Sequence, residues 1–338
     1  MTPPVVSGLH FGYPLSILAV KEAYRPWLYS NFIQLFCPRN FPSESFLSIY
    51  FHAAYPFLIC PLLDIQWIGK DLIGGDLEDF IIGCIERDYY VQVFADEYYI
   101  PQRNAFQKSH FMHEVLVTGF ARKERLFQVL GYNQYGQFLQ SYVPFGQLAL
   151  SVRAVDSLSE AQGCFRADKI WLARYVEDET CELDLTSIRE QLGDLLGSKD
   201  SSQRFRMVGP PEEVGAYRVS QDSVFGLEVY LAFRRYLEQL IEGQACFDPR
   251  HIYLLWEHKK IMAERLAYLE EEGYLPVEKG YARKYAEVAG AFGILRMMHL
   301  KFGQNGDRAL GRRMVGRFNP LVEDETALLQ AVLSDFSI

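Results

Sequence analysis

The segment from Asp96 to Phe145 constrains the fold more than any other part of this 338-residue chain. It contains two runs with the alternating apolar pattern of β-strands, HEVLVTGF (113–120) and LFQVLGY (126–132), separated by a short charged stretch. Strand runs this close together are typical of an antiparallel hairpin. His113 begins the first run, and Asn133 follows the second in a Gly-Tyr-Asn turn. The hairpin therefore predicts an antiparallel sheet, with these two polar residues at hairpin separation.

The elements around this hairpin predict an α+β first part and a helical last part. The 76–90 stretch has apolar residues at helical spacing and Asp76 as a helix N-cap, and 90–100 alternates as a strand does. A helix is also expected to start near 147. We expect an α+β core over 1–160, a connecting segment with one strand and one helix over 161–215, and a helical bundle over 216–338 that packs on the core.

Two further features describe local order. The 13–36 stretch predicts a helix with Pro14 near its start and a break or kink at Pro26. The polar stretch 198–215 contains a Pro-Pro turn, and we expect the weakest order of the chain there.

Charge and cysteine usage narrow the classes of partner. The net charge is 34 − 43 = −9, which argues against non-specific nucleic-acid binding, since that requires clustered Lys and Arg. The six cysteines contain no CxxC pair and indicate neither a zinc ribbon nor a disulfide framework. No apolar run approaches the ~20 residues of a membrane span. The N-terminus also lacks the basic start of a secretory signal. We expect a cytoplasmic protein with reduced thiols that binds neither nucleic acid nor membranes.

His113 is the leading candidate for a catalytic residue. An imidazole titrates near neutral pH and can serve as a general base. Asn133 could accept its ring N–H and hold the useful tautomer, as the third member of a triad does. The alternative is a structural histidine at a strand start and an asparagine that forms a turn.

Three residues upstream lies His110, and the preceding strand ends near Asp96 and Tyr99. His110 and His113 have the H-x-x-H spacing of metal ligands, but this pattern is common by chance, and no metal is predicted. We expect His110 to line a pocket entrance or to stabilise a loop. Asp96 could bind an amine and a tyrosine could donate to an oxyanion, or Asp96 could cap the strand end.

A nucleophile is not evident. An enzyme that works as cysteine proteases do needs a cysteine at a helix N-terminus, where the helix dipole and a nearby histidine lower the thiol pKa. The first helix begins around His10-Phe11-Gly12-Tyr13-Pro14, without a cysteine. Cys37 lies at the far end of that helix, and Cys60 lies in an apolar run typical of a core.

Three motifs together carry a resemblance to a known family. HFGYPLSIL, the stretch DEYYIPQRNAFQKSHFMHEVLVTGF with GYNQYGQF after it, and YLLWEHKKIMAERLAYL resemble bacterial proteins related to butirosin biosynthesis protein H. Such proteins are often encoded beside nonribosomal peptide synthetase clusters. The resemblance implies a papain-like cysteine-peptidase fold with an added helical region. It also implies transfer of an acyl group from a carrier-protein thioester to an amine, with His113 as base and Asn133 as its orienting residue. The family fold's cysteine would fall around Phe11 or Gly12, neither of which is a nucleophile.

These observations lead to a first hypothesis and two alternatives. The first is an amide-forming acyltransferase of natural-product, or antibiotic, biosynthesis. It would have no cofactor of its own, use the phosphopantetheine arm of an acyl or peptidyl carrier protein, and act on a small-molecule amine. The alternatives are a degenerate papain-fold scaffold for a synthetase and, third, a cysteine peptidase. The expected substrate-binding residues are Asp96, Tyr99, His110, His10 and Tyr13.

Overall fold

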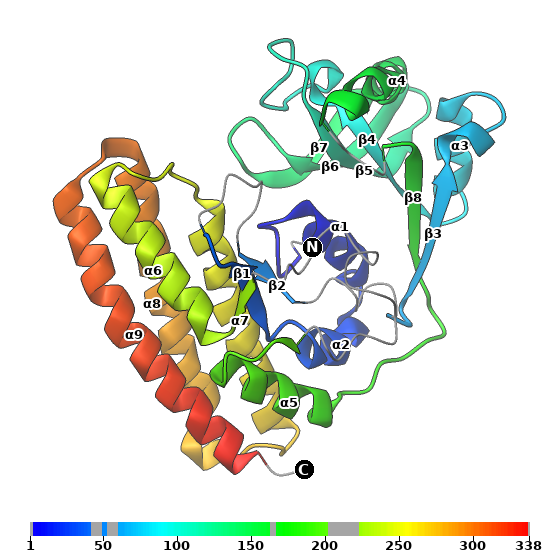
Figure 1. Cartoon of the computed structure of the whole chain (residues 1–338). Coiled ribbons are helices and arrows are strands. Elements are labelled where there is room, and N and C mark those ends of the chain that lie inside the picture. The colour runs from blue at the N-terminus through cyan, green and yellow to red at the C-terminus, as the bar shows by residue number, and fades with distance from the viewer. Residues whose placement is uncertain (1–2, 42–48, 53–59, 163–166, 202–222, 337–338) are drawn as a thin grey trace. The chain divides into compact units, whose positions relative to one another are not determined.

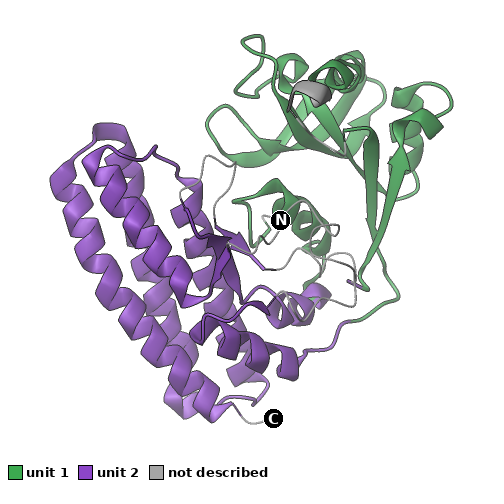
Figure 2. Ribbon diagram, viewed as in Figure 1, with its two compact units in different colours: residues 1–22, 61–180 green, residues 23–60, 181–338 purple. Residues whose placement is uncertain are grey.

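The computed structural model describes residues 3–41, 49–52, 60–162, 167–201 and 223–336 (Figure 1). The chain divides into two compact units, and each unit is built from two separate stretches of sequence (Figure 2). Unit 1 comprises residues 1–22 and 61–180, and unit 2 comprises residues 23–60 and 181–338. The sequence predicted contiguous segments instead. The difference arises because the chain leaves unit 1 after residue 22 and returns to it at residue 61.

Unit 1 is organised around a six-stranded antiparallel sheet. Its strands, in spatial order, are β3 (Leu63–Gly69), β8 (Lys169–Tyr175), β4 (Tyr90–Asp96), β5 (Met112–Ala121), β6 (Leu126–Tyr132) and β7 (Phe138–Pro144). The predicted hairpin is β5–β6, with Phe120 opposite Phe127. The mixed α+β character and the antiparallel sheet expected from the sequence are therefore confirmed.

Helices lie on both sides of this sheet. Helices α3 (Leu77–Ile85) and α4 (Phe145–Gln162) contribute to one core cluster with the alternate residues Val91, Val93, Val115 and Val117. Asp76 caps α3 by accepting from the backbone N–H of Glu78, as the sequence predicts. Helix α1 (Leu9–Leu18) lies on the side of the sheet away from α4 (Figure 1). Helices therefore pack on both faces of the sheet, although alternate residues of its outer strands, such as Trp67 and Tyr142, remain exposed.

Unit 2 is mainly helical. It contains a three-stranded antiparallel sheet in the order β2 (Tyr50–Phe51), β1 (Leu35–Pro38) and β9 (Ser223–Phe225). Its helices are α2 (Arg25–Ser30), α5 (Leu185–Leu196), α6 (Leu227–Glu242), α7 (Arg250–Glu271), α8 (Tyr281–Asn305) and α9 (Arg308–Asp335). The expected C-terminal helices are therefore present. Most of the stretch predicted to be weakly ordered, 198–215, lies outside the described residues.

The helix predicted over 13–36 is interrupted. Helix α1 begins at Leu9, so that Pro14 lies inside it. Pro26 lies in the first turn of a separate helix, α2, where a missing N–H is tolerated. The chain then continues as strand β1 rather than as helix. Among the described residues, no helix is both long and apolar enough to cross a lipid bilayer.

Candidate functional site

A pocket of about 480 Å³ opens in unit 1 at the end of the sheet where β4 ends and β5 begins. It is lined by Glu97, His113, Tyr132 and Asn133, together with six residues of the 104–111 loop, which include His110. The structure therefore brings both histidines singled out in the sequence to one pocket. A concave site with convergent polar groups is where ligand binding is expected first.

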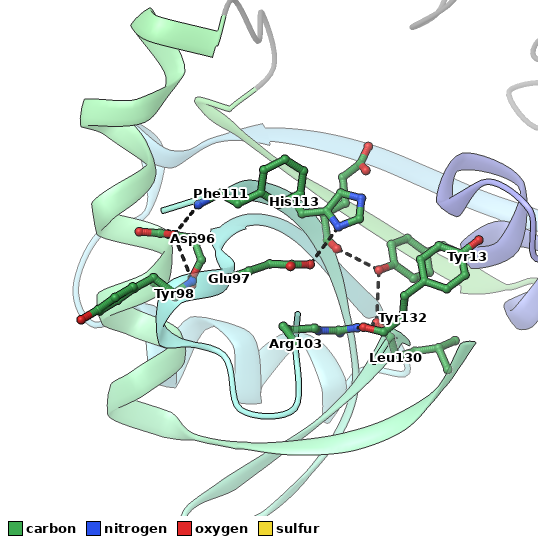
Figure 3. A network of polar contacts seen from close by, with 11 residues as sticks. Tyr13, Asp96, Glu97, Tyr98, Arg103, Phe111, His113, Leu130 and Tyr132 are labelled. Atoms are coloured by element: carbon green, nitrogen blue, oxygen red, sulfur yellow. Dashed lines mark hydrogen bonds and ion pairs between the residues drawn. The ribbon is translucent and has the colours of Figure 1, made fainter. Parts of the chain in front are cut away.

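His113 is held by Glu97. Strands β4 and β5 pair with Ala95 opposite His113, so the residues just beyond the end of β4 lie beside this histidine. Glu97 begins a short 3₁₀ turn there, and its Oε1 accepts from His113 Nδ1 at 2.9 Å (Figure 3). The Glu97 side chain is 8% exposed and the His113 side chain 22%. This contact places the ring proton on Nδ1 and leaves Nε2 as the basic nitrogen.

His110 is held by Asp96 in the same manner. Asp96 is fully buried, and its Oδ1 accepts from the backbone N–H groups of Tyr98 at 3.1 Å and Phe111 at 3.0 Å. Its Oδ2 lies 2.6 Å from His110 Nδ1. The Tyr98 ring stacks on the His110 ring, with 4.5 Å between centroids. Asp96 is therefore fixed by the backbone and positions His110, rather than being open to an amine substrate.

The strand end beneath the pocket is fixed by buried groups. The guanidinium of Arg103, only 4% exposed, donates to the backbone oxygens of Tyr132 and Leu130. The Tyr13 hydroxyl, from α1, contacts the backbone oxygens of Glu114 at 2.9 Å and Leu130 at 3.1 Å (Figure 3). These contacts connect α1, β5 and β6 below the two imidazoles.

Asn133 does not orient His113. Its Oδ1 accepts from the backbone N–H groups of Tyr135 at 2.9 Å and Gln137 at 3.0 Å, and its Nδ2 donates to the Gln137 side chain. The amide therefore closes the turn between β6 and β7, as the alternative interpretation of this residue had it. Asn133 still lines the pocket. The residue that orients His113, however, is Glu97 and not Asn133, to which the sequence analysis had assigned that role.

Of the five predicted substrate-binding residues, only His110 lines the pocket, and Asp96, His10, Tyr13 and Tyr99 lie outside its lining. His10 lies in α1 and is only partly exposed, and the burial of its ring lowers its pKa to about 3 and keeps it neutral. Tyr13 is buried, and burial raises its pKa. Tyr99 packs edge-on against Tyr98 and does not line the pocket.

No described cysteine lines the pocket. Cys37 lies in β1 of unit 2, where burial raises its thiol pKa to about 12, and Cys60 is also buried. Phe11, at the helix start, is 1% exposed. Ser109 lines the pocket, but among the described residues no hydrogen bond joins its hydroxyl to either histidine. A serine nucleophile requires such a bond to its base.

The sequence interpretation missed Glu97 and Arg103. Asp-Glu at the end of one strand and His-x-x-His before the next is a usable signal, because antiparallel pairing brings these two ends together. No comparable signal marks Arg103. Within the described part of the chain, no cluster of three or more His, Cys, Asp or Glu side chains is arranged to hold a metal ion.

No protein-family model matches this chain, and no curated protein matches it at a significant level.

Proposed function

We propose that this protein is an amide-forming acyltransferase with a papain-like core, which transfers an acyl group from a carrier-bound thioester to an amine by direct aminolysis. The observation that carries the proposal is the His113–Glu97 pair in an open pocket that no described cysteine lines. An imidazole backed by a carboxylate is suited to remove a proton from an attacking nucleophile.

The chemistry follows from the orientation of His113. With Nδ1–H donating to Glu97, Nε2 accepts a proton from the amine while the amine nitrogen bonds to the thioester carbonyl carbon. The tetrahedral intermediate then collapses, the C–S bond breaks, and the thiol leaves with a proton. The products are an amide and the free thiol of the carrier arm. A thioester is already activated, and tethering it in the pocket supplies the effective concentration that the reaction needs.

The papain-like assignment is supported by the arrangement of unit 1. A helix near the N-terminus packs by Tyr13 against an antiparallel sheet, and a histidine lies at the start of a strand of that sheet. The resemblance would put the cysteine of the family fold around Phe11 or Gly12, neither of which is a nucleophile, and this favours a reaction without an acyl-enzyme.

The carrier protein would approach at the pocket rather than at the β5–β6 turn. Arg122 and Arg125 in that turn are paired with Glu86 at 2.6 Å and Glu78 at 2.7 Å. The turn also lies at the far end of β5 from His113, about 30 Å along the strand at ~3.3 Å per residue. Lys108, which lines the pocket, is a nearer contact for the phosphate of the arm.

The test combines intact-mass spectrometry with product analysis after incubation with acyl-pantetheine thioesters and a panel of amines. We expect new amide in solution and no adduct on the protein. His113→Gln should lower kcat/KM at least 100-fold, since general base catalysis contributes about 10²–10⁴ in rate. Glu124→Gln, an exposed carboxylate of the same unit, is the matched control and should leave the rate unchanged.

Two results would contradict the proposal. An acyl adduct on the protein would indicate a nucleophile, which peptide mapping would locate at Ser109 or at a cysteine. Absence of both amide and adduct across the panel would favour the scaffold protein of a synthetase.

A further inference from the structure

We infer that His110, held by Asp96, is a second catalytic residue: the general acid that protonates the leaving sulfur. This inference rests on the proposed aminolysis at the same pocket and assigns the step that His113 does not perform. The observation behind it is that the pocket contains two imidazoles, each backed by its own carboxylate.

The first argument is the construction around His110. Its ring is 54% exposed, yet it is fixed on two sides, by the Asp96 carboxylate at 2.6 Å and by the stacked ring of Tyr98. Asp96 is in turn fixed by two backbone N–H groups, and its own carbonyl oxygen accepts from Ser151 of α4 at 2.7 Å. A surface histidine that only stabilises a loop does not require a buried carboxylate held by two backbone N–H groups, on a residue whose backbone is itself held by Ser151.

The second argument is that the two pairs are equivalent in chemistry and differ in depth. Both rings contact their carboxylate through Nδ1, so each presents Nε2 for proton transfer. Both histidines line the same pocket, so a thioester and an amine bound there can reach both rings. His113 is 22% exposed and His110 54%, which places His110 nearer the mouth.

Depth assigns the roles. A thioester on a carrier arm enters through the mouth, so its sulfur lies on the outer side of the carbonyl carbon. The outer imidazole is then the one beside the departing sulfur, and the inner imidazole faces the attacking amine. His113 Nε2 gains the amine proton as the C–N bond forms. Protonated His110 gives its Nε2 proton to sulfur as the C–S bond breaks. After the reaction, exchange with water removes the proton from His113 and adds one to His110. His113 is then neutral and His110 protonated, as at the start.

The test uses two acyl donors that differ only in the leaving thiol. An alkyl thiolate is a more basic leaving group than an aryl thiolate and gains more from a general acid. For an acyl-N-acetylcysteamine donor, His110→Gln should lower kcat/KM about 100-fold. For the matching thiophenyl ester, the loss should be less than about fivefold. His113→Gln should lose about 100-fold with both donors. His110→Gln should also remove the alkaline limb of the kcat/KM–pH profile for the alkyl donor, because that limb reports the acid.

Each outcome decides between the assignments. An equal loss with both donors, or no loss with either, overturns the acid role of His110 while leaving the proposed aminolysis intact. Retention of the alkaline limb in His110→Gln does the same. A wild-type protein that is inactive on both donors overturns the proposed function itself. The exposure of His110 makes the glutamine variant compatible with folding, and an unchanged Tm should accompany it.

Discussion

At the scale of single residues, the chemistry of the pocket depends on which carboxylate faces which imidazole. Glu97 lies beside His113 because β4 and β5 pair with Ala95 opposite His113, and a shift of one residue would remove the contact. Asp96, one residue earlier, points to His110 instead. The adjacent residues Asp96 and Glu97, at the end of β4, thus each contact one of the two histidines.

The first prediction concerns the orienting partner of His113. Glu97→Gln should lower kcat about 100-fold or more, because a carboxylate that fixes the imidazole tautomer and stabilises the imidazolium is lost. Asn133→Asp keeps the oxygen that accepts from Tyr135 and Gln137, and should change kcat less than tenfold. Steady-state kinetics of both variants decide the matter. The reverse order of effects would return the orienting role to Asn133.

The second prediction concerns Gly131, at the strand end below the pocket. Its φ is +151°, and a Cβ there would lie 2.6 Å from the buried guanidinium of Arg103. Gly131→Ala should therefore displace Arg103 from the Tyr132 and Leu130 carbonyls and lower the free energy of unfolding by about 3 kcal/mol.

Gly136, in the next turn, is the matched control for that change. Its φ is +72°, and no atom lies within 4 Å of the position of an added Cβ. Gly136→Asn should cost less than about 1 kcal/mol, since asparagine adopts the left-handed conformation readily. Urea denaturation measures both variants, and equal losses would contradict the role given to Arg103.

At the scale of elements, unit 2 is held by a polar network inside its helices. Lys259 of α7 and Glu325 of α9 are both fully buried and form an ion pair at 2.7 Å. The hydroxyls of Tyr230 (α6) and Tyr285 (α8) also contact Glu325. One carboxylate therefore connects four helices, and it fixes their register in a way that apolar packing alone does not.

The third prediction follows from this network. Glu325→Leu should lower the free energy of unfolding by about 3–5 kcal/mol, because it leaves the Lys259 ammonium buried without a counter-ion. The double variant Lys259→Met/Glu325→Leu should recover most of that loss. Glu323→Gln, an exposed position on the same helix, should have no effect. Thermal unfolding of the wild type, Glu325→Leu, Lys259→Met and the double variant forms a double-mutant cycle, and additive losses would show that the pair is not coupled.

Elements with a long periodic pattern could be predicted from the sequence, and short ones could not. The helical region expected over 216–338 contains the long helices α6 and α7, and Gly243 follows α6 in the left-handed conformation. The run LFCP was assigned to a helix end, because four apolar residues do not distinguish helix from strand. Its strand partner β9 lies far away in sequence, and no local pattern reveals such pairing. The same holds for the candidate site. His113 could be identified from its residue type, whereas the role of Glu97 could be identified only once the register between β4 and β5 was known.

At the scale of the whole molecule, five of the seven histidines have a lowered pKa caused by burial. Four of them are in unit 2: His52, His251 and His299, each with a pKa of about 4, and His258, with a pKa well below 6.5. Below pH 6.5 the unfolded chain binds protons at these positions, and the folded chain does not. The contribution of these neutral histidines to the free energy of unfolding is therefore fully present above pH 6.5 and is lost as the pH falls toward 4.

The fourth prediction is the size and origin of that decline. As the pH falls from 6.5 to 4, each buried histidine should lower the free energy of unfolding by up to about 1.4 kcal/mol per pH unit. His299 packs against Phe247 at 4.7 Å between ring centroids, and neither ring nitrogen has a hydrogen-bond partner among the described residues. His299→Phe should reduce the slope of stability against pH by the contribution of one histidine, and the variant should remain folded at pH 7. Calorimetric Tm values from pH 7 to 4 test this, and an unchanged slope would contradict it.

The division of each unit into two stretches of sequence has a consequence for synthesis on the ribosome. All of unit 1 has been translated once residue 180 is made, but by then only residues 23–60 of unit 2 exist. Strand β1 ends at Pro38 and its partner β9 begins at Ser223, so β1 waits for 223 − 38 = 185 further residues. At 5–20 residues per second, this is a delay of about 10–40 s. During that interval β1 can pair only with β2, and helix α2 lacks α5 and α7, which it contacts in the complete unit 2. Unit 2 is therefore open to misassembly after unit 1 has been translated in full, and this is the stage at which a chaperone would protect the nascent chain most.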